Sequence, residues 1–149
     1  MKPVKLGERA ERIVGRERFG PARRVRSSRD FQRVRRRGRQ VSGHLLTLSY
    51  ARRPEAEAPL RAGFSVSKRV GGAVVRNRVK RRLRESVRHL LVLLVPGWDI
   101  VLTAKPAAAA ATYAALEGET RALLSRAGLW RADTLDTAVE TTASSQGLP

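Results

Sequence analysis

The sequence predicts a single α+β domain in which a small sheet is packed by helices. Its length of 149 residues suits one domain with a modest core. Hydrophobic periodicity changes along the chain in the order helix, two or three strands, long helix, strand, helix. Segments containing Gly and Pro separate these stretches, and there is no internal repeat. Such an order favours helices layered on one sheet.

The first helix is expected to begin after Ser27 or Ser28 and to end near Arg37. Serine is a favoured N-cap residue, and Asp30 adds an acid to the first turn. Gly38 would end the helix at the C′ position, where a left-handed backbone favours glycine.

Strand patterns follow this helix. Residues 39–42 are expected to form a short strand, and residues 44–51 alternate in polarity over a longer, β-rich stretch. Residues 52–59 form a polar loop with two prolines. We expect residues 60–66 to return as the second strand of a hairpin.

The period becomes helical again from Val75. The apolar positions fall within about a third of the helical wheel. They are Val75, Val79, Leu83, Val87, Leu90, Leu91 and Leu94. The opposite face is basic and holds Arg78, Arg81 and Arg88, flanked by Asn77 and Arg82. Pro96 and Gly97 are expected to stop this helix.

Two further elements complete the predicted fold. Residues 98–104 are mostly apolar and predict an interior strand. Residues 112–126 predict a last helix that points Leu116, Leu123 and Leu124 inward.

The two ends of the chain lack this periodicity. Residues 1–24 alternate charged and small residues, which predicts a flexible basic arm. Residues 129–149 are small, polar and slightly acidic, which predicts a disordered tail. The folded domain is therefore expected to span residues 25–128.

Charge is the strongest functional signal. Lys and Arg number 31 against 13 Asp and Glu, a formal net charge of +18. Residues 1–90 carry 27 basic and 7 acidic residues, whereas residues 91–149 carry 4 and 6. Such an excess repels itself in a compact domain, and a polyanionic partner offsets the repulsion. Because the cations are localised, the pattern is typical of nucleic-acid binding.

Other classes fit the sequence less well. The chain has no cysteine, so disulfides and thiolate metal sites are excluded. No apolar run approaches the roughly 18–20 residues that span a bilayer. The basic N-terminus also lacks the apolar segment of a secretory signal. We therefore expect a cytoplasmic protein that does not enter a membrane.

The sequence offers no catalytic site of its own. His44 and His89 lack a spaced Asp, Glu or second His that would complete a metal set or a triad. The carboxylates are scattered and form no local cluster of the kind that holds two metal ions. We therefore expect no catalytic residue and no metal ligand in the protein.

The most informative segment is residues 64–85, a glycine-containing loop that leads into the basic helix. Its cations are Lys68, Arg69, Arg76, Arg78, Lys80, Arg81, Arg82 and Arg84, and its one acid is Glu85. A helix N-terminus presents free N–H groups and a positive dipole end, and both favour a phosphate. Gly71 and Gly72 allow close approach of the backbone. The segment predicts a phosphate-binding surface, since an ordinary solvated helix face mixes both signs.

This segment resembles the bacterial ribonuclease P protein family. The run Arg76-Asn77-Arg78, followed by Lys80, Arg81 and Arg84, is similar to the family's signature. Other segments match in the family's order, namely Asp30-Phe31, residues 63–69, Gly72-Ala73-Val74, Asp99-Ile100-Val101 and Lys105-Pro106. The resemblance covers residues 24–128 and depends on this ordered set.

The resemblance implies both a fold and a function. The fold would be a single αβββαβα domain with a left-handed βαβ crossover, of a type shared with a ribosomal protein domain. The protein would bind the catalytic RNA of ribonuclease P and the 5′ leader of precursor tRNA, and promote endonucleolytic removal of that leader. The RNA, with bound Mg²⁺, would perform the hydrolysis. The protein alone would hold no cofactor and need no obligate protein partner.

The resemblance also assigns residues. The implied RNA-binding positions are Ser67, Lys68, Arg69, Arg76, Asn77, Arg78, Lys80, Arg81 and Arg84. The implied leader-binding positions are Phe31, Arg35 and Ser65. Phe31 fits stacking on leader bases and packing in the core equally well. Arg35 and Ser49 stand where the family often has aromatic residues, so leader binding would depend more on charge than on stacking.

Two other functions stay open. A ribosomal-type protein that stabilises folded RNA has a similar composition, although the ordered motifs argue against it. A self-contained nuclease is disfavoured by the missing catalytic residues. Purification distinguishes the three. A single large RNA that co-purifies and supports leader cleavage would favour the ribonuclease P function. Whole ribosomes would favour the ribosomal function, and cleavage without RNA would favour a nuclease.

Overall fold

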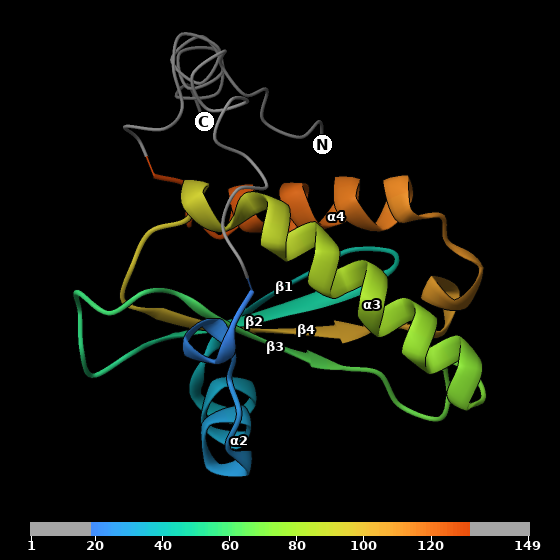
Figure 1. Cartoon of the computed structure of the whole chain (residues 1–149), viewed down its shortest axis with the longest axis horizontal. Helices are drawn as coiled ribbons and strands as arrows, with labels where there is room; N and C mark the ends of the chain where they lie inside the picture. Colours follow the sequence, from blue (N-terminus) through green and yellow to red (C-terminus); the bar gives the residue numbers. More distant parts are fainter. Residues whose placement is uncertain (1–18, 132–149) are drawn as a thin grey trace, which may run out of the picture.

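The computed structural model describes residues 19–131, which form three layers (Figure 1). The main elements are α2 (Ser28–Arg37), β1 (Arg39–Ser42), β2 (Leu46–Arg52), β3 (Arg61–Ser65), α3 (Ala73–Leu90), β4 (Trp98–Ala104) and α4 (Tyr113–Arg126). Short 3-10 helices are η1 (Pro21–Arg23), η2 (Leu91–Leu93) and η3 (Pro106–Ala110). The predicted αβββαβα order and α+β class are confirmed.

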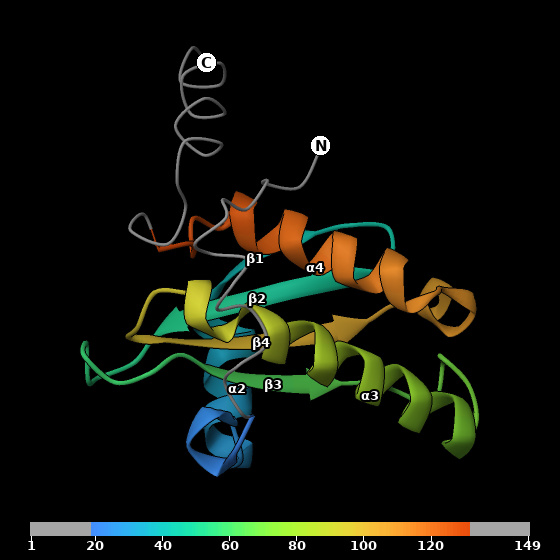
Figure 2. The same cartoon turned by 45° about the horizontal axis from the view of Figure 1, so that its top comes forward.

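The strands form one mixed sheet in the order β1-β2-β4-β3. β2 is antiparallel to β1 and to β4, whereas β3 and β4 are parallel. Helices α3 and α4 cover one face of the sheet and α2 covers the other (Figures 1 and 2). In Figure 2, α3 lies in front of the sheet, β3 and β4 both run to the right, and β4 lies above β3. The β3–α3–β4 crossover is therefore left-handed, against the usual rule.

The predicted hairpin between β2 and β3 is wrong. β4 lies between these two strands and pairs with both. Burial explains the arrangement, because every residue of β4 from Asp99 to Leu102 is buried and the strand needs neighbours on both edges. The prediction of β4 as an interior strand is thereby confirmed.

β2 begins at Leu46, later than the predicted His44, because the residues before it form a turn. The N–H of Gly43 donates to the carbonyl of Leu46 at 2.8 Å. The Glu119 carboxylate of α4 accepts from the N–H groups of Leu45 and Leu46 at 2.8 and 2.6 Å. A Cβ at Gly43 would lie 2.6 Å from this carboxylate, so a larger residue there would displace the Glu119 side chain.

The start of α2 follows the prediction, whereas its end differs. Ser27 is the N-cap, and its Oγ accepts from the N–H of Asp30 at 3.0 Å. Gly38 is the C-cap with φ of −77°, so the left-handed C′ position expected for it is wrong. Glycine is needed there for close packing instead. An added Cβ would lie 2.4 Å from the carbonyl oxygen of Val34 and 2.6 Å from that of Tyr50.

α3 ends at Leu90, well before the predicted stop at Pro96. The residues after it pair with the chain that follows α4. Leu94 and Trp130 form a β-bridge, and the N–H of Arg131 donates to the carbonyl of Leu93 at 2.7 Å. This tertiary pairing requires an extended backbone, which overrides the helical periodicity.

Ordered packing extends a few residues beyond residues 25–128 at each end. Phe19 is 7% exposed and packs into the core, and Arg24 forms a parallel bridge with β3. At the other end, Leu129 is 1% exposed. The short segments that carry these residues therefore belong to the folded domain. The rest of the predicted arm and tail, residues 1–18 and 132–149, lies outside the described residues.

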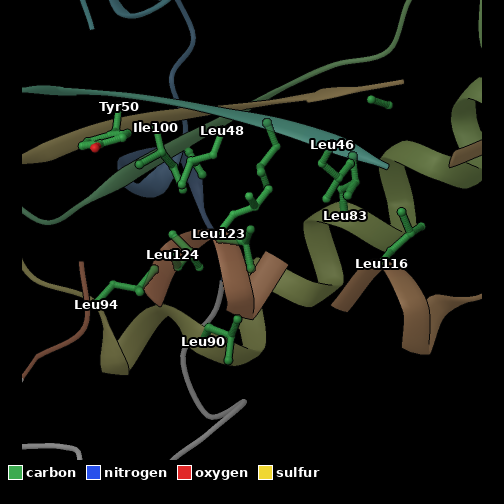
Figure 3. Close-up of a cluster of buried hydrophobic side chains, with 14 of the residues drawn as sticks. Leu46, Leu48, Tyr50, Leu83, Leu90, Leu94, Ile100, Leu116, Leu123 and Leu124 are labelled. Atoms are coloured by element: carbon green, nitrogen blue, oxygen red, sulfur yellow. The ribbon is translucent and has the colours of Figure 1, made fainter. Parts of the chain in front are cut away.

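The core lies between the sheet and the layer formed by α3 and α4 (Figure 3). Side chains of β2 and β4 face leucines of the two helices, namely Leu46, Leu48, Tyr50 and Ile100 against Leu83, Leu90, Leu116, Leu123 and Leu124. The predicted inward positions of α4 are confirmed. No helix within residues 19–131 is long and apolar enough to cross a membrane.

Candidate nucleic-acid interface

The loop between β3 and α3 is cationic and exposed. Ser67, Lys68 and Arg69 all face solvent, and the N–H of Val70 closes the turn on the carbonyl of Ser67 at 3.1 Å. Gly72 is the N-cap of α3, provides no capping side chain, and has open space where a Cβ would lie. The first N–H groups of α3 are therefore accessible to an anion.

Three residues of α3 form an exposed strip: Asn77, Arg81 and Arg84. They share one side of the helix because they are four and three residues apart. Arg76 and Lys80 are half-buried. Within residues 19–131, neither Arg81 nor Arg84 has an acidic partner, so both can bind phosphate.

Arg78, which the sequence places on the basic face of the helix, is half-buried. Its guanidinium donates to the carbonyl of Ala109 at 3.2 Å. Arg82, one turn later, donates to the carbonyl of Ala111 at 2.6 Å. Both arginines therefore hold the segment before α4 against α3. Sequence reasoning missed this role because a carbonyl acceptor leaves no signal in the sequence.

Glu85 is the one acid of the 64–85 segment, and its charge is neutralised locally. Arg88 donates to its carboxylate at 2.5 Å, and His89 lies 3.1 Å away. The hydrogen bond from Arg88, opposed by burial, holds the pKa of Glu85 below its ordinary value. The N-terminal half of α3 is therefore left entirely cationic. Across the part of the chain that the structure describes, no three His, Asp or Glu side chains are grouped to hold a metal ion.

On the other face of the sheet, a buried carboxylate anchors α2. Asp99 is 0% exposed, and Arg61 donates to both of its oxygens at 2.7 Å. Arg33 of α2 donates to the same carboxylate, and Asp30 lies 3.4 Å from Arg61. The hydrogen bond with Asp99 raises the pKa of Arg61. Sequence reasoning missed both arginines; the available signal was a lone acid in an apolar strand, which needs a buried partner.

Phe31 contacts β3 and also lines a cavity. Its ring lies so close to Gly63 that a Cβ there would be 2.6 Å from it. A cavity of about 170 Å³ beside the ring is lined by aromatic and cationic side chains, among them Phe19, Phe31, Phe64, Arg24, Lys80 and Arg84. Phe31 is therefore half-buried, with part of its ring packed on β3 and part lining the cavity.

Arg35 and Ser65 lie near Phe31 on the α2 side of the sheet. Ser65 points to the same face as Gly63 because it is two residues further along the strand. Arg35 is exposed, one turn after Phe31. Ser49 faces the same side but is 2% exposed, since α2 covers it. The three predicted leader residues therefore share the α2 side of the sheet, and Phe31 approaches Arg84 of the α3 strip at the cavity that both line.

A small α+β domain whose long helix exposes a cationic strip and holds a single, locally neutralised acid is characteristic of RNA-binding proteins. The family model described as Ribonuclease P matches residues 19–128. The chain therefore belongs to the ribonuclease P protein family.

Relatives support this assignment. The chain is 46% identical over 109 residues to the ribonuclease P protein component of Roseiflexus castenholzii, covering 72% of this chain and 88% of that protein. For the component of Chloroflexus aurantiacus the identity is 44% over 117 residues, covering 78% and 85%. These relatives favour a tRNA-processing subunit over the ribosomal alternative.

Solved structures agree. The RNase P protein of Staphylococcus aureus superposes with a TM-score of 0.68 at 28% identity, covering 74% of this chain and 99% of that one. The protein of Thermotoga maritima superposes with a TM-score of 0.62 at 23% identity, covering 69% and 96%, and supports the fold alone.

Proposed function

We propose that this protein holds the catalytic RNA of ribonuclease P on its α3 face and the 5′ leader of precursor tRNA on its α2 face. The observation that carries the proposal is the position of the two cationic helices on opposite faces of one sheet (Figure 2). One RNA segment can lie on each face, and the two surfaces meet at the cavity that Phe31 shares with Lys80 and Arg84.

The RNA-binding residues would be those of the loop and of α3. They are Ser67, Lys68, Arg69, Arg76, Asn77, Arg78, Lys80, Arg81 and Arg84. The apolar side of α3 is buried in the core, so its exposed strip has one orientation. Each arginine that forms a charge-assisted hydrogen bond to phosphate would contribute on the order of 1–3 kcal/mol.

The leader-binding residues would be Phe31, Arg35 and Ser65. An exposed ring stacks on any base and contributes roughly 1–3 kcal/mol per base. Arg35 adds charge where a second ring is missing. The substrate would therefore be recognised as a single strand with little dependence on its sequence.

Hydrolysis of the leader would be performed by the RNA. The side chains of residues 19–131 offer no group of three metal-binding acids or histidines, so Mg²⁺ would be held by RNA phosphates. The protein would contribute affinity and position, in the cytoplasm, where precursor tRNA is processed.

Reconstitution with the cognate RNA tests this proposal. The protein alone should cleave no precursor tRNA, and it should raise cleavage by the RNA at low Mg²⁺. Arg81→Ala should weaken assembly with the RNA whatever the substrate, whereas Phe31→Ala should reduce only the preference for precursor over mature tRNA. Cleavage without RNA, or an effect of Phe31→Ala on assembly alone, would refute the assignment. Circular dichroism of each variant controls for folding.

A further inference from the structure

Four hydroxyl side chains form a row across all four strands. The register pairs Ser42 with Thr47, Thr47 with Thr103, and Thr103 with Ser65. Directly paired residues point to the same face of a sheet. Accordingly, the Oγ of Ser42 lies 2.9 Å from the Oγ1 of Thr47. With strands about 4.8 Å apart, the row is about 14 Å long.

This hydroxyl row lies on the α2 face of the sheet. Thr103 is four residues from Asp99 on the same strand, so both side chains point to one face, and Asp99 binds Arg33 of α2. The helix covers the neighbouring row, where Phe31 touches Gly63, and leaves the hydroxyl row accessible. Ser42 is exposed, and the other three members are half-buried.

The row has unused hydrogen-bonding capacity. In the described part of the chain, the hydroxyls of Thr103 and Ser65 have no hydrogen-bond partner. Ser42 and Thr47 bond to each other, which leaves further capacity on each oxygen. A row of neutral groups that both donate and accept suits a ligand with the same property.

α2 borders the row with a different chemistry. The side of the helix that carries Asp30 and Arg33 faces Asp99. Phe31 and Arg35, one turn apart, lie toward the opposite side, and Gln40 beyond the helix donates to the carbonyl of Arg35 at 3.4 Å. An RNA strand beside α2 would therefore meet a ring and a cation along the helix and a neutral hydroxyl surface on the sheet.

We propose that Ser42, Thr47, Thr103 and Ser65 bind ribose 2′-hydroxyl groups of the single-stranded leader and make this site selective for RNA over DNA. The inference rests on the proposed binding of the leader beside α2. Arg35 attracts phosphate and Phe31 attracts a base, so the sugar edge is left for the neutral row. The 2′-hydroxyl donates and accepts, and it is the group by which proteins distinguish RNA from DNA.

The test uses the full chain assembled with its cognate RNA and two precursor tRNAs. One has an all-RNA leader, and the other has 2′-deoxy sugars in the leader except at the nucleotide next to the scissile bond. The wild-type complex should bind the all-RNA leader about 3- to 10-fold more tightly, as one or two neutral hydrogen bonds would give. The double variant Thr47→Val/Thr103→Val keeps the β-branched shape and removes the two central hydroxyls, so it should lose most of the preference for the all-RNA leader.

Controls separate this inference from the function on which it rests. Ser49→Ala, which removes a covered hydroxyl on the same face, should keep the RNA preference, and Ser65→Ala should reduce it. The inference is wrong if the wild type does not discriminate, as phosphate contacts would predict, or if the double variant discriminates as strongly as the wild type. If Phe31→Ala also leaves precursor affinity unchanged, leader binding beside α2 is itself wrong.

Discussion

Helices α2 and α3 are both basic, yet different forces attach them to the sheet. α3 buries a long apolar stripe that includes Val79, Leu83, Val87 and Leu90. α2 buries Val34 alone and is held by the ion pairs of Asp99 with Arg33 and Arg61. A long helix can thus reserve one side for the core, whereas a ten-residue helix with five arginines needs a buried acid in the sheet.

This difference explains how the sheet presents cations on both faces. Arginines four residues apart on α2 repel one another, and the apolar surface that the helix buries through Val34 is too small to offset this repulsion. Asp99 supplies an opposite charge where solvent screens it least. Its bidentate geometry with Arg61 provides two of the hydrogen bonds that a buried carboxylate requires.

The largest effect is expected from removing this acid. Asp99→Ala leaves Arg33 and Arg61 with only the partly exposed Asp30 as an acidic partner, and breaking a buried ion pair costs about 3–5 kcal/mol. Urea unfolding followed by circular dichroism measures the change in the free energy of unfolding. Hydrogen exchange should show that amides of α2 lose protection before those of α3. A loss below about 1 kcal/mol would mean that Val34 and the cap at Ser27 suffice to hold the helix.

Leu83→Ala makes the matching change on α3. Loss of a fully buried leucine costs about 2–5 kcal/mol, because a cavity is left behind. Since α3 and α4 share one core, exchange should increase in both helices together. The same urea titration at low and high salt should give an unchanged difference from the wild type. Selective loss of α3 would contradict a shared core.

A smaller effect separates scaffold from binding within α3. Arg78→Ala removes the bond to the carbonyl of Ala109, so it should lower stability by about 1 kcal/mol as well as RNA affinity. Arg81→Ala should lower RNA affinity by a similar amount and leave stability within about 0.5 kcal/mol of wild type. Thermal unfolding and RNA titration on both variants check this. Equal stability of the two variants would mean that the Ala109 contact contributes nothing.

Local signals in the sequence determined much of this fold. Ser27 and Thr112 were recognisable as the start of helices, and each accepts a capping hydrogen bond. The apolar stripe of α3 followed from period alone. Strand order did not follow, because pairing of β4 between β2 and β3 depends on burial over the whole sheet.

The same limit applies to the candidate site. The exposed arginines of α3 could be predicted, since charge and period are local properties. The partners of Asp99 and the row that joins Thr47 to Thr103 could not, because both depend on register between strands distant in sequence. Gly38 is a third case. Its place at the end of a helix could be predicted, but the close contact with Tyr50 that requires glycine there appears only in the folded structure.

The smallest expected effect is the pH dependence of α2. Burial acts to raise the pKa of Asp30, but the Ser27 hydroxyl, Arg61 and Arg33 together hold it below the ordinary value of 3.8. A carboxyl group with a lowered pKa stabilises the fold fully above its unfolded pKa, and this contribution is lost as the pH falls through the folded pKa. Protection of α2 amides should therefore decrease as the pH falls below about 3.8.

Asp30→Asn isolates this contribution from other carboxylates. The variant should be slightly less stable at neutral pH and should show a flatter pH dependence of α2 exchange. Because Asp30 is 28% exposed, salt should screen most of the difference. Glu85→Gln is the matched control on α3, where the pKa is also lowered. It should alter the C-terminal turn of α3 and leave α2 unchanged. If Asp30→Asn and wild type respond identically to acid, then Asp99 and Val34 hold α2 without help from its first turn.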